Sequence, residues 1–188
     1  PKSKADLAFT MHMLSWLAVD GTAAIVEFPG VLYRGAAEAK IRQYLVENNY
    51  VDAVIQLPPD LFFGTTIGTC IIVLKKSKQD SRVLFVDASK QFVREGNKNK
   101  LSAENQEMIL ETLAKRVDID HVAALVSAEA IRENGFNLSV SSYVEAEDAR
   151  EEVDIVELNA RIKEIVERQA VLRASIDEIV ADLEGGAR

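Results

Sequence analysis

The sequence is poor in the residue types that build disulfide frameworks and metal sites. It has one cysteine and two histidines among 188 residues, which excludes an intrachain disulfide and a cysteine-based zinc site. His12 and His121 stand too far apart in the sequence to form a local metal motif, so no metal site is predicted. Cys70 lies inside an apolar run and is expected to be a buried, inert thiol.

Long hydrophobic runs are missing too. The chain has no stretch of about 18 or more consecutive apolar residues, so no membrane-spanning helix and no membrane partner are predicted. Residues 1–4 lack both the apolar segment of a signal peptide and an initiating methionine. These features predict a cytoplasmic chain that is a piece of a longer protein.

The glycine- and proline-rich stretches match no complete catalytic or phosphate-binding motif. Residues 64–68 contain two glycines without a following Lys-Ser or Lys-Thr, so they are not a P-loop. Pro58-Pro59 is flanked by Leu57 and Asp60, whereas amine methylation in a Pro-Pro motif needs a hydrogen-bond acceptor before it and an aromatic residue after it. No nucleophile, acid–base pair or cofactor-binding residue is predicted. Phe62 and Phe63 admit two interpretations, as core residues or as the lip of a substrate pocket.

Acidic residues outnumber basic ones by 30 to 22, which gives a net charge of −8. That balance argues against a free-standing nucleic-acid binder, because phosphate contacts need a basic face. Residues 145–188, however, carry −7 of the total, while residues 75–100 carry +5. The basic stretch is either a solvated loop surface or a set of DNA-phosphate contacts, for which the candidates are Lys75, Lys76, Lys90, Arg94, Lys98 and Lys100.

The order of apolar segments predicts an α/β fold. A strand, a helix and a strand in sequence indicate a parallel crossover. The next loop, residues 58–68, is too short for a second crossover, so the strand that follows should run antiparallel and the sheet should be mixed. The expected helices cover 5–19, 36–48, 102–116 (capped by Ser102) and a short segment from Ser127 to Gly135; the expected strands cover 23–28, 51–57, 69–74 and 83–86, with a polar, basic loop over 88–100.

The C-terminal segment has the most regular pattern in the chain. Apolar residues recur in steps of three and four from Ile155 to Leu183, which predicts a helix of roughly 40 Å with a heptad seam. The seam either packs back on the preceding residues or docks on helices of another chain. The candidate docking residues are Leu158, Ile162, Ile165, Leu172, Ile176 and Ile179. We predict three parts: a sheet domain over 1–90, a basic loop with a helical extension over 91–145, and the acidic helix over 146–188.

Several stretches, in order, resemble the methylation subunits of type I restriction-modification systems. They are Ala5 to Phe9 with His12-Met13-Leu14, Gly30 to Gly35, Ala37 to Arg42, Asp52 to Pro58, Leu61 to Thr65, Thr69 to Lys76, Val83 to Ser89, and Glu133-Asn134 with Asn137-Leu138 and Tyr143-Val144. The resemblance covers roughly residues 3–145, and the heptad helix matches the family's C-terminal helix in position and type only.

The resemblance implies an adenine-N6 DNA methyltransferase that uses S-adenosylmethionine and assembles with a DNA-specificity subunit and a restriction subunit. In that family the cofactor glycines and the Asn-Pro-Pro-aromatic motif precede the part matched here. The chain is therefore expected to be the C-terminal half of a Rossmann-like methyltransferase sheet, with a parallel pair and an antiparallel strand, followed by helices and a long partner helix. Alone, it should neither transfer methyl groups nor bind the cofactor tightly. The candidate target-base pocket is Phe62, Phe63, Gly64 and Thr65.

The sequence departs from the family pattern at a few positions. Pro29-Gly30 stands where the family has Pro-His-Gly, and Ser142 stands where an arginine often precedes the tyrosine. Two other functions remain open beside the methyltransferase. One is a non-catalytic module that presents the terminal helix to a partner. The other, a nucleotide-binding Rossmann enzyme, lacks a phosphate-cradling loop.

Overall fold

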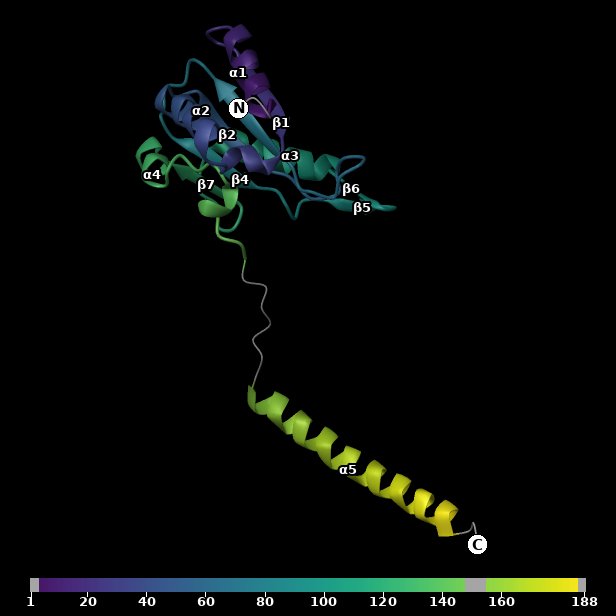
Figure 1. Ribbon diagram of the computed structural model, residues 1–188. Helices are drawn as coiled ribbons and strands as arrows, with labels where there is room; N and C mark the ends of the chain where they lie inside the picture. Colours follow the sequence, from purple (N-terminus) through teal and green to yellow (C-terminus); the bar gives the residue numbers. More distant parts are fainter. Residues whose placement is uncertain (1–3, 148–154, 186–188) are drawn as a thin grey trace. The chain divides into compact units, whose positions relative to one another are not determined.

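The computed structural model describes residues 4–147 and 155–185. The chain divides into two units, residues 1–147 and residues 148–188, each of which is described by itself. The first unit is an α/β domain and the second contains one helix (Figure 1). The three-part division expected from the sequence remains a prediction. None of the described helices has the length and apolar character needed to cross a membrane.

The centre of the first unit is a mixed five-stranded sheet. Its order is β1-β3-β2-β4-β7. β3 runs antiparallel to both β1 and β2, β4 runs parallel to β2, and β7 runs antiparallel to β4. The strands are β1 Thr22–Glu27, β2 Val51–Gln56, β3 Cys70–Lys75, β4 Val83–Asp87 and β7 Ala123–Val126. The mixed sheet with an antiparallel strand after the 58–68 loop is thus confirmed.

The strand order also corrects the sequence-based topology. β1 and β2 point the same way, as a crossover requires, but they are not neighbours, because β3 lies between them. The adjacent parallel pair is β2 and β4. β7 was not predicted at all. β1 is an edge strand, and among the described residues only β3 pairs with it.

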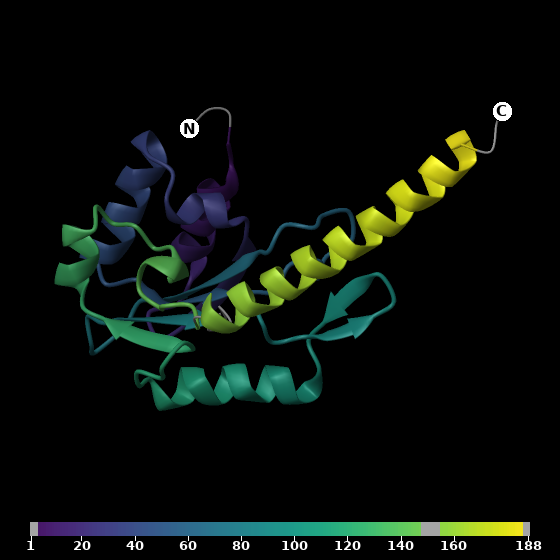
Figure 2. The same ribbon diagram turned by 90° about the horizontal axis from the view of Figure 1, so that it is seen from below.

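Helices cover both faces of the sheet (Figure 2). On one face, α1 (Asp6–Trp16), α2 (Ala36–Glu47) and α4 (Ala128–Glu133) pack against apolar side chains such as Phe85 of β4. On the other face, α3 (Ala103–Lys115) places Ile109 against Ile55 and Leu84. The central strand β2 is therefore buried on both sides, as its nearly continuous apolar run indicates.

Local capping explains where these helices begin and end. Ser102 and Asn105 form a reciprocal capping box, with hydrogen bonds of 3.0 and 3.2 Å, as the predicted cap at Ser102 requires. Ser127 accepts a hydrogen bond from the amide of Ala130 and starts α4, and Gly135 follows that helix at φ +62°. α1 ends at Trp16, earlier than expected, since Leu17 is already extended.

A small β-hairpin replaces the loop predicted over residues 88–100. β5 (Val93–Glu95) pairs with β6 (Lys98–Lys100) across a two-residue Gly96-Asn97 turn. Gly96 adopts φ +59°, which glycine tolerates without strain. Figure 1 shows the hairpin projecting beyond the main sheet.

Two short 3₁₀ segments complete the first unit, η1 (Pro29–Leu32) after β1 and η2 (Val140–Ser142) near its end. η1 places Val31 and Leu32 in the core, and Leu32 accepts a hydrogen bond from the amide of Leu138. Arg42 of α2 donates to the carbonyl oxygens of Val31 and Phe136, both at 2.9 Å. The connection after β1 and the C-terminal part of the unit are thereby joined.

The second unit is α5, Ile155–Gly185, a helix of 31 residues. At 1.5 Å per residue its length is roughly 46 Å. The six candidate docking residues on its heptad seam are all exposed: Leu158, Ile162, Ile165, Leu172, Ile176 and Ile179. The predicted helix is confirmed, and it presents an apolar seam.

Candidate functional site

The pocket loop, residues 57–69, joins the carboxyl end of β2 to the start of β3. It lies beside the carboxyl end of β1, because Glu27 pairs with Cys70 in the sheet register. The carboxyl ends of parallel strands are where open α/β sheets bind their ligands. A cavity of about 380 Å³ opens there, and its lining residues are Asp6, Val26, Glu27, Phe28, Phe62, Phe63, Thr65 and Thr69.

Aromatic side chains form one part of this pocket. Phe63 is fully exposed, while Phe62 and Phe28 are about half exposed. The interpretation of Phe62 and Phe63 as core residues is therefore wrong, and they border a cavity instead. Gly64, between Phe63 and Thr65, adopts φ +81°, a backbone conformation that a side chain there would strain. The four residues predicted from the sequence thus lie together, three of them on the pocket lining.

Two buried polar residues that the sequence did not single out complete the lining. Glu27 accepts a hydrogen bond of 3.0 Å from the hydroxyl of Thr10, and burial raises the pKa of its carboxyl above the ordinary value. The Thr69 hydroxyl is buried and has no hydrogen-bond partner among the described residues. An unsatisfied buried hydroxyl at a cavity wall costs stability unless a ligand or water supplies a partner.

Cys70, next to Thr69, fits the predicted inert thiol. It is fully buried, and its Sγ lies 3.4 Å from the carbonyl oxygen of Glu27. Burial raises the pKa of the thiol to about 12, so it stays protonated and is no nucleophile at neutral pH.

The six candidate phosphate contacts do not gather on one surface. Lys75 ends β3 and Lys76 follows it, at the end of the sheet opposite the pocket loop, whereas Arg94, Lys98 and Lys100 belong to the hairpin. Lys98 donates to carbonyl oxygens of the pocket loop, while Lys100 is exposed and pairs with Glu95 at 2.8 Å. Lys90 pairs with Glu147. Lys98 and Arg94 contact the pocket loop, Lys98 through two carbonyl oxygens and Arg94 through the carboxylate of Asp60 at 3.7 Å.

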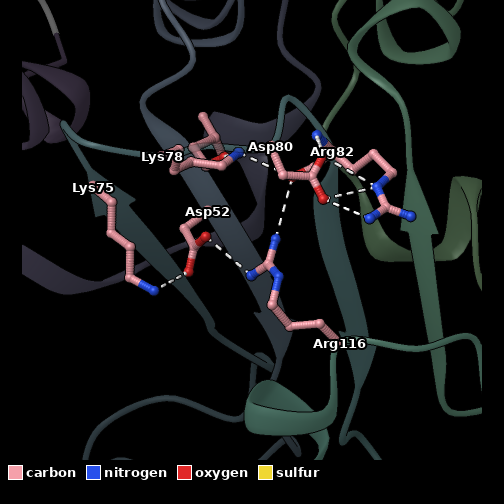
Figure 3. Close-up of polar contacts among 7 residues, drawn as sticks. Asp52, Lys75, Lys78, Asp80, Arg82 and Arg116 are labelled. Carbon is pink, nitrogen blue, oxygen red and sulfur yellow. Dashed lines mark hydrogen bonds and ion pairs between the residues drawn. The ribbon is translucent and has the colours of Figure 1, made fainter.

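The Lys75 end of the sheet forms a compact ionic cluster (Figure 3). The buried carboxylate of Asp52 lies 2.9 Å from Lys75 Nζ and 3.0 Å from Arg116 Nη1. Lys78 donates to the carbonyl oxygens of Val51 and Arg82, at 2.6 and 2.9 Å. The arrangement ties β2, β3 and the end of α3 together, so Lys75 has a structural role whatever else it binds.

Lys78 makes this cluster sensitive to alkaline pH. Burial lowers the pKa of its ammonium from 10.5 to about 8. Between those values the folded chain binds fewer protons than the unfolded chain, so the free energy of unfolding rises with pH from about 8 to 10.5. We expect a gain of about 1–2 kcal/mol, reduced for partial solvent screening. Denaturant unfolding of the wild type and of Lys78→Met at pH 7.5 and 10 measures it. A difference between the two proteins that does not change with pH would contradict the prediction.

Neither histidine contributes to a metal site in the described part of the chain, where no cluster of three or more potential ligands exists. His12 is exposed and packs on Trp16, with ring centroids 4.8 Å apart. His121 is exposed at φ +60°, and its Nδ1 lies 3.1 Å from the carbonyl oxygen of Glu145.

The described residues do not fit a nucleoside cofactor of the kind held by a glycine-rich strand-to-helix turn. Among the described connections from a strand to a helix, that from β1 to α2 contains Gly30 and Gly35. The Arg34 side chain covers Gly30, so a ligand cannot approach that backbone closely. Residues 64–68 lead into β3 instead of a helix. No step through such a cofactor is therefore assigned to these residues.

The chain belongs to the N-6 DNA methylase family, whose model matches residues 1–152. The resemblance to type I methylation subunits is confirmed. The chain is 47% identical to the methylase subunit of the type I restriction enzyme MpnII from Mycoplasma pneumoniae, over 97% of this chain and 34% of that protein. It therefore spans about a third of the length of this relative.

Solved structures agree with this assignment. The type I restriction-modification methyltransferase subunit from Streptococcus thermophilus superposes with a TM-score of 0.76 at 46% identity, over 77% of this chain and 31% of that one. The EcoKI M protein superposes with a TM-score of 0.63 at 17% identity, over 94% of this chain and 44% of that one. The second likeness supports the fold alone.

Proposed function

We propose that this chain is the C-terminal part of a type I modification subunit that, as a full-length protein, transfers a methyl group to adenine N6 in DNA. The observation that carries the proposal is the pocket loop, whose exposed Phe62 and Phe63 border a cavity at the carboxyl ends of the strands. Enzymes that modify a base turn it out of the duplex and stack it on aromatic side chains. In this proposal Phe63 and Phe62 receive the extruded adenine.

The polar lining residues hold the same base. The unpartnered Thr69 hydroxyl hydrogen-bonds an edge of the adenine, and Glu27, positioned by Thr10, adds an acceptor that favours an amine over a carbonyl group. S-adenosylmethionine supplies the methyl group when bound by the remainder of the subunit. We accordingly expect the 188-residue chain alone to be inactive and to bind that cofactor weakly.

The partners follow from the same assignment. α5 docks the DNA-specificity subunit through its exposed seam, and a restriction subunit joins the assembly. The substrate is double-stranded DNA, and the assembly acts in the cytoplasm. All six basic candidates have partners inside the chain. Lys100 and Arg94 are exposed on the hairpin, which contacts the pocket loop, and are the best placed to meet DNA phosphates; Lys90, Lys98, Lys75 and Lys76 stay candidates.

A non-catalytic interaction module is the second candidate function, favoured by the exposed seam of α5. In that case, α5 would capture its partner, yet no base would enter the pocket. The two functions differ in whether the pocket residues affect methyl transfer.

Phe63→Ala tests the pocket. Aromatic stacking on a base contributes about 1–3 kcal/mol. We therefore expect the rate of methyl transfer at a fixed DNA concentration to fall roughly 10- to 100-fold. The assay measures transfer of radiolabelled methyl from S-adenosylmethionine to a duplex, using the full-length protein assembled with its specificity subunit.

Leu110→Ala is the matched control, since it also removes an exposed apolar side chain, but from α3 and away from the pocket. Activity of that variant should equal the wild type. If Phe63→Ala transfers methyl groups at the wild-type rate, Phe63 does not bind the base. If the wild-type protein is itself inactive, the interaction module is favoured.

A further inference from the structure

The β5–β6 hairpin has almost no core of its own. All three residues of β5 are exposed, and in β6 only Asn99 is buried. An isolated two-stranded hairpin is marginally stable in water. Contacts outside the hairpin must therefore hold it in place, and among the described residues these contacts are concentrated on the pocket loop.

The contacts run from hairpin donors to backbone carbonyls of the loop. Asn99 donates its amide to the carbonyl oxygen of Asp60 at 3.1 Å, and its Nδ2 to that of Pro59 at 2.8 Å. Lys98 Nζ donates to the carbonyl oxygens of Phe62 and Thr65, at 3.1 and 3.2 Å. The two Lys98 acceptors stand on either side of Phe63 and Gly64, so one ammonium closes the turn that carries the aromatic side chain.

Two contacts to the Asp60 carboxylate and one to the Asn99 amide oxygen hold these side chains in turn. Asp60 Oδ1 lies 3.8 Å from Lys98 Nζ, and Asp60 Oδ2 lies 3.7 Å from Arg94 Nη1. Arg94 also donates to Asn99 Oδ1 at 2.9 Å, which leaves Asn99 Nδ2 directed at the loop. The Lys98 ammonium thus donates hydrogen bonds to two carbonyls and also forms an ion pair with one carboxylate.

No residue in the described part of the chain buries the Phe63 side chain. That side chain is fully exposed, and the loop backbone adopts left-handed conformations at Asp60 and Gly64, which are held by their surroundings. The backbone between residues 62 and 65 accordingly sets the direction in which the Phe63 side chain leaves the loop. That backbone is what Lys98 bridges.

We propose that Lys98, supported by Asn99, is a positioning residue: it orders the pocket loop so that Phe62 and Phe63 are prearranged for the base, instead of contacting DNA phosphate itself. This inference rests on the proposed function for its consequence in catalysis, but the ordering of the loop is testable without any activity.

Lys98→Met removes the donors and keeps the length of the side chain. Hydrogen–deuterium exchange in the full-length protein without DNA should become about ten-fold faster in a peptide spanning residues 61–67. In Lys98→Arg, which restores donors, exchange should return toward the wild-type rate. Lys100→Met is the matched control: Lys100 is a lysine on the same strand, but it pairs with Glu95 and not with the loop. Its exchange should equal the wild type.

The kinetic consequence separates positioning from phosphate contact. If Lys98 positions the loop, Lys98→Met lowers kcat for methyl transfer about ten-fold, and the slope of log DNA affinity against log salt stays unchanged. If Lys98 binds phosphate, loop exchange stays at the wild-type rate and the salt slope falls by about one, which overturns the proposal. If the wild type transfers no methyl group, the proposed function fails while the exchange result still decides the ordering of the loop. Asp60→Asn is the second variant, for use if Lys98→Met compromises the fold. It weakens the ion pairs of Asp60 with Lys98 and Arg94 from the loop side, so it should also make exchange in the loop faster.

Discussion

If α5 docks the DNA-specificity subunit as proposed, glutamate at both Ile162 and Ile176 will abolish capture of that subunit. Both side chains lie two heptads apart on the apolar seam and are about half exposed in the helix unit. In a docked seam they would be buried, and an unpaired carboxylate placed there costs several kcal/mol. Two such sites should reduce affinity at least 1,000-fold, measured by pull-down and by calorimetry with the separately purified subunit.

Val171→Glu is the control for this result. It places a carboxylate on the same helix at an exposed position outside the seam. Glutamate favours helix about as well as the residues replaced, so circular dichroism should show equal helix content in both variants. Unchanged capture by the double variant would show that the seam is not the docking surface. Loss of capture by Val171→Glu alone would show that the docking face is wider than the seam.

Phe85→Ala will destabilise the first unit by about 3–5 kcal/mol. Phe85 is fully buried in β4, and its ring stacks on Tyr143 at 4.3 Å between centroids. Its removal leaves a cavity between the sheet and the C-terminal part of the unit, which cannot collapse because β4 pairs on both sides. Denaturant unfolding followed by circular dichroism measures the change.

Phe92→Ala provides the comparison, since Phe92 is a partly exposed phenylalanine outside both core clusters. It should cost less than about 1 kcal/mol. Equal destabilisation by the two substitutions would mean that Phe85 does not occupy the core position assigned to it.

The sequence predicted those helices and strands that are defined by neighbouring residues, such as an apolar run or a helix cap. The apolar runs of β2 and β3 and the short loop between them gave the antiparallel pair, and the Ser102 cap gave the start of α3. The position of β3 between β1 and β2 depends on pairing between distant segments, for which the linear pattern carries no signal. β7 is four residues long and partly buried, too short for a clear alternation.

The site was predicted only in its exposed part. Phe62 and Phe63 are an aromatic pair that follows a strand end, and this pattern predicted them as candidate pocket residues. Thr69 and Glu27 gained significance only when the register brought β1 beside β3. The hairpin had a sequence signal, the two-residue Gly96-Asn97 turn, but the polar strands around it concealed that signal. Charge alone could not distinguish Lys98, which bonds to the loop, from Lys100, which does not.

The order of strands in the sheet also fixes an order of events during synthesis. β1 leaves the ribosome before β3, the strand that pairs with it in the described part of the chain, and β3 begins only at Cys70. At about 5–20 residues per second, roughly two to nine seconds separate the two. Meanwhile β2 and β3 can form their hairpin as soon as residue 75 emerges, and β1 then joins a surface already made. Through that interval the nascent chain exposes the edge of β1 that β3 later covers, which makes the early chain, more than the finished domain, the species that a chaperone would meet.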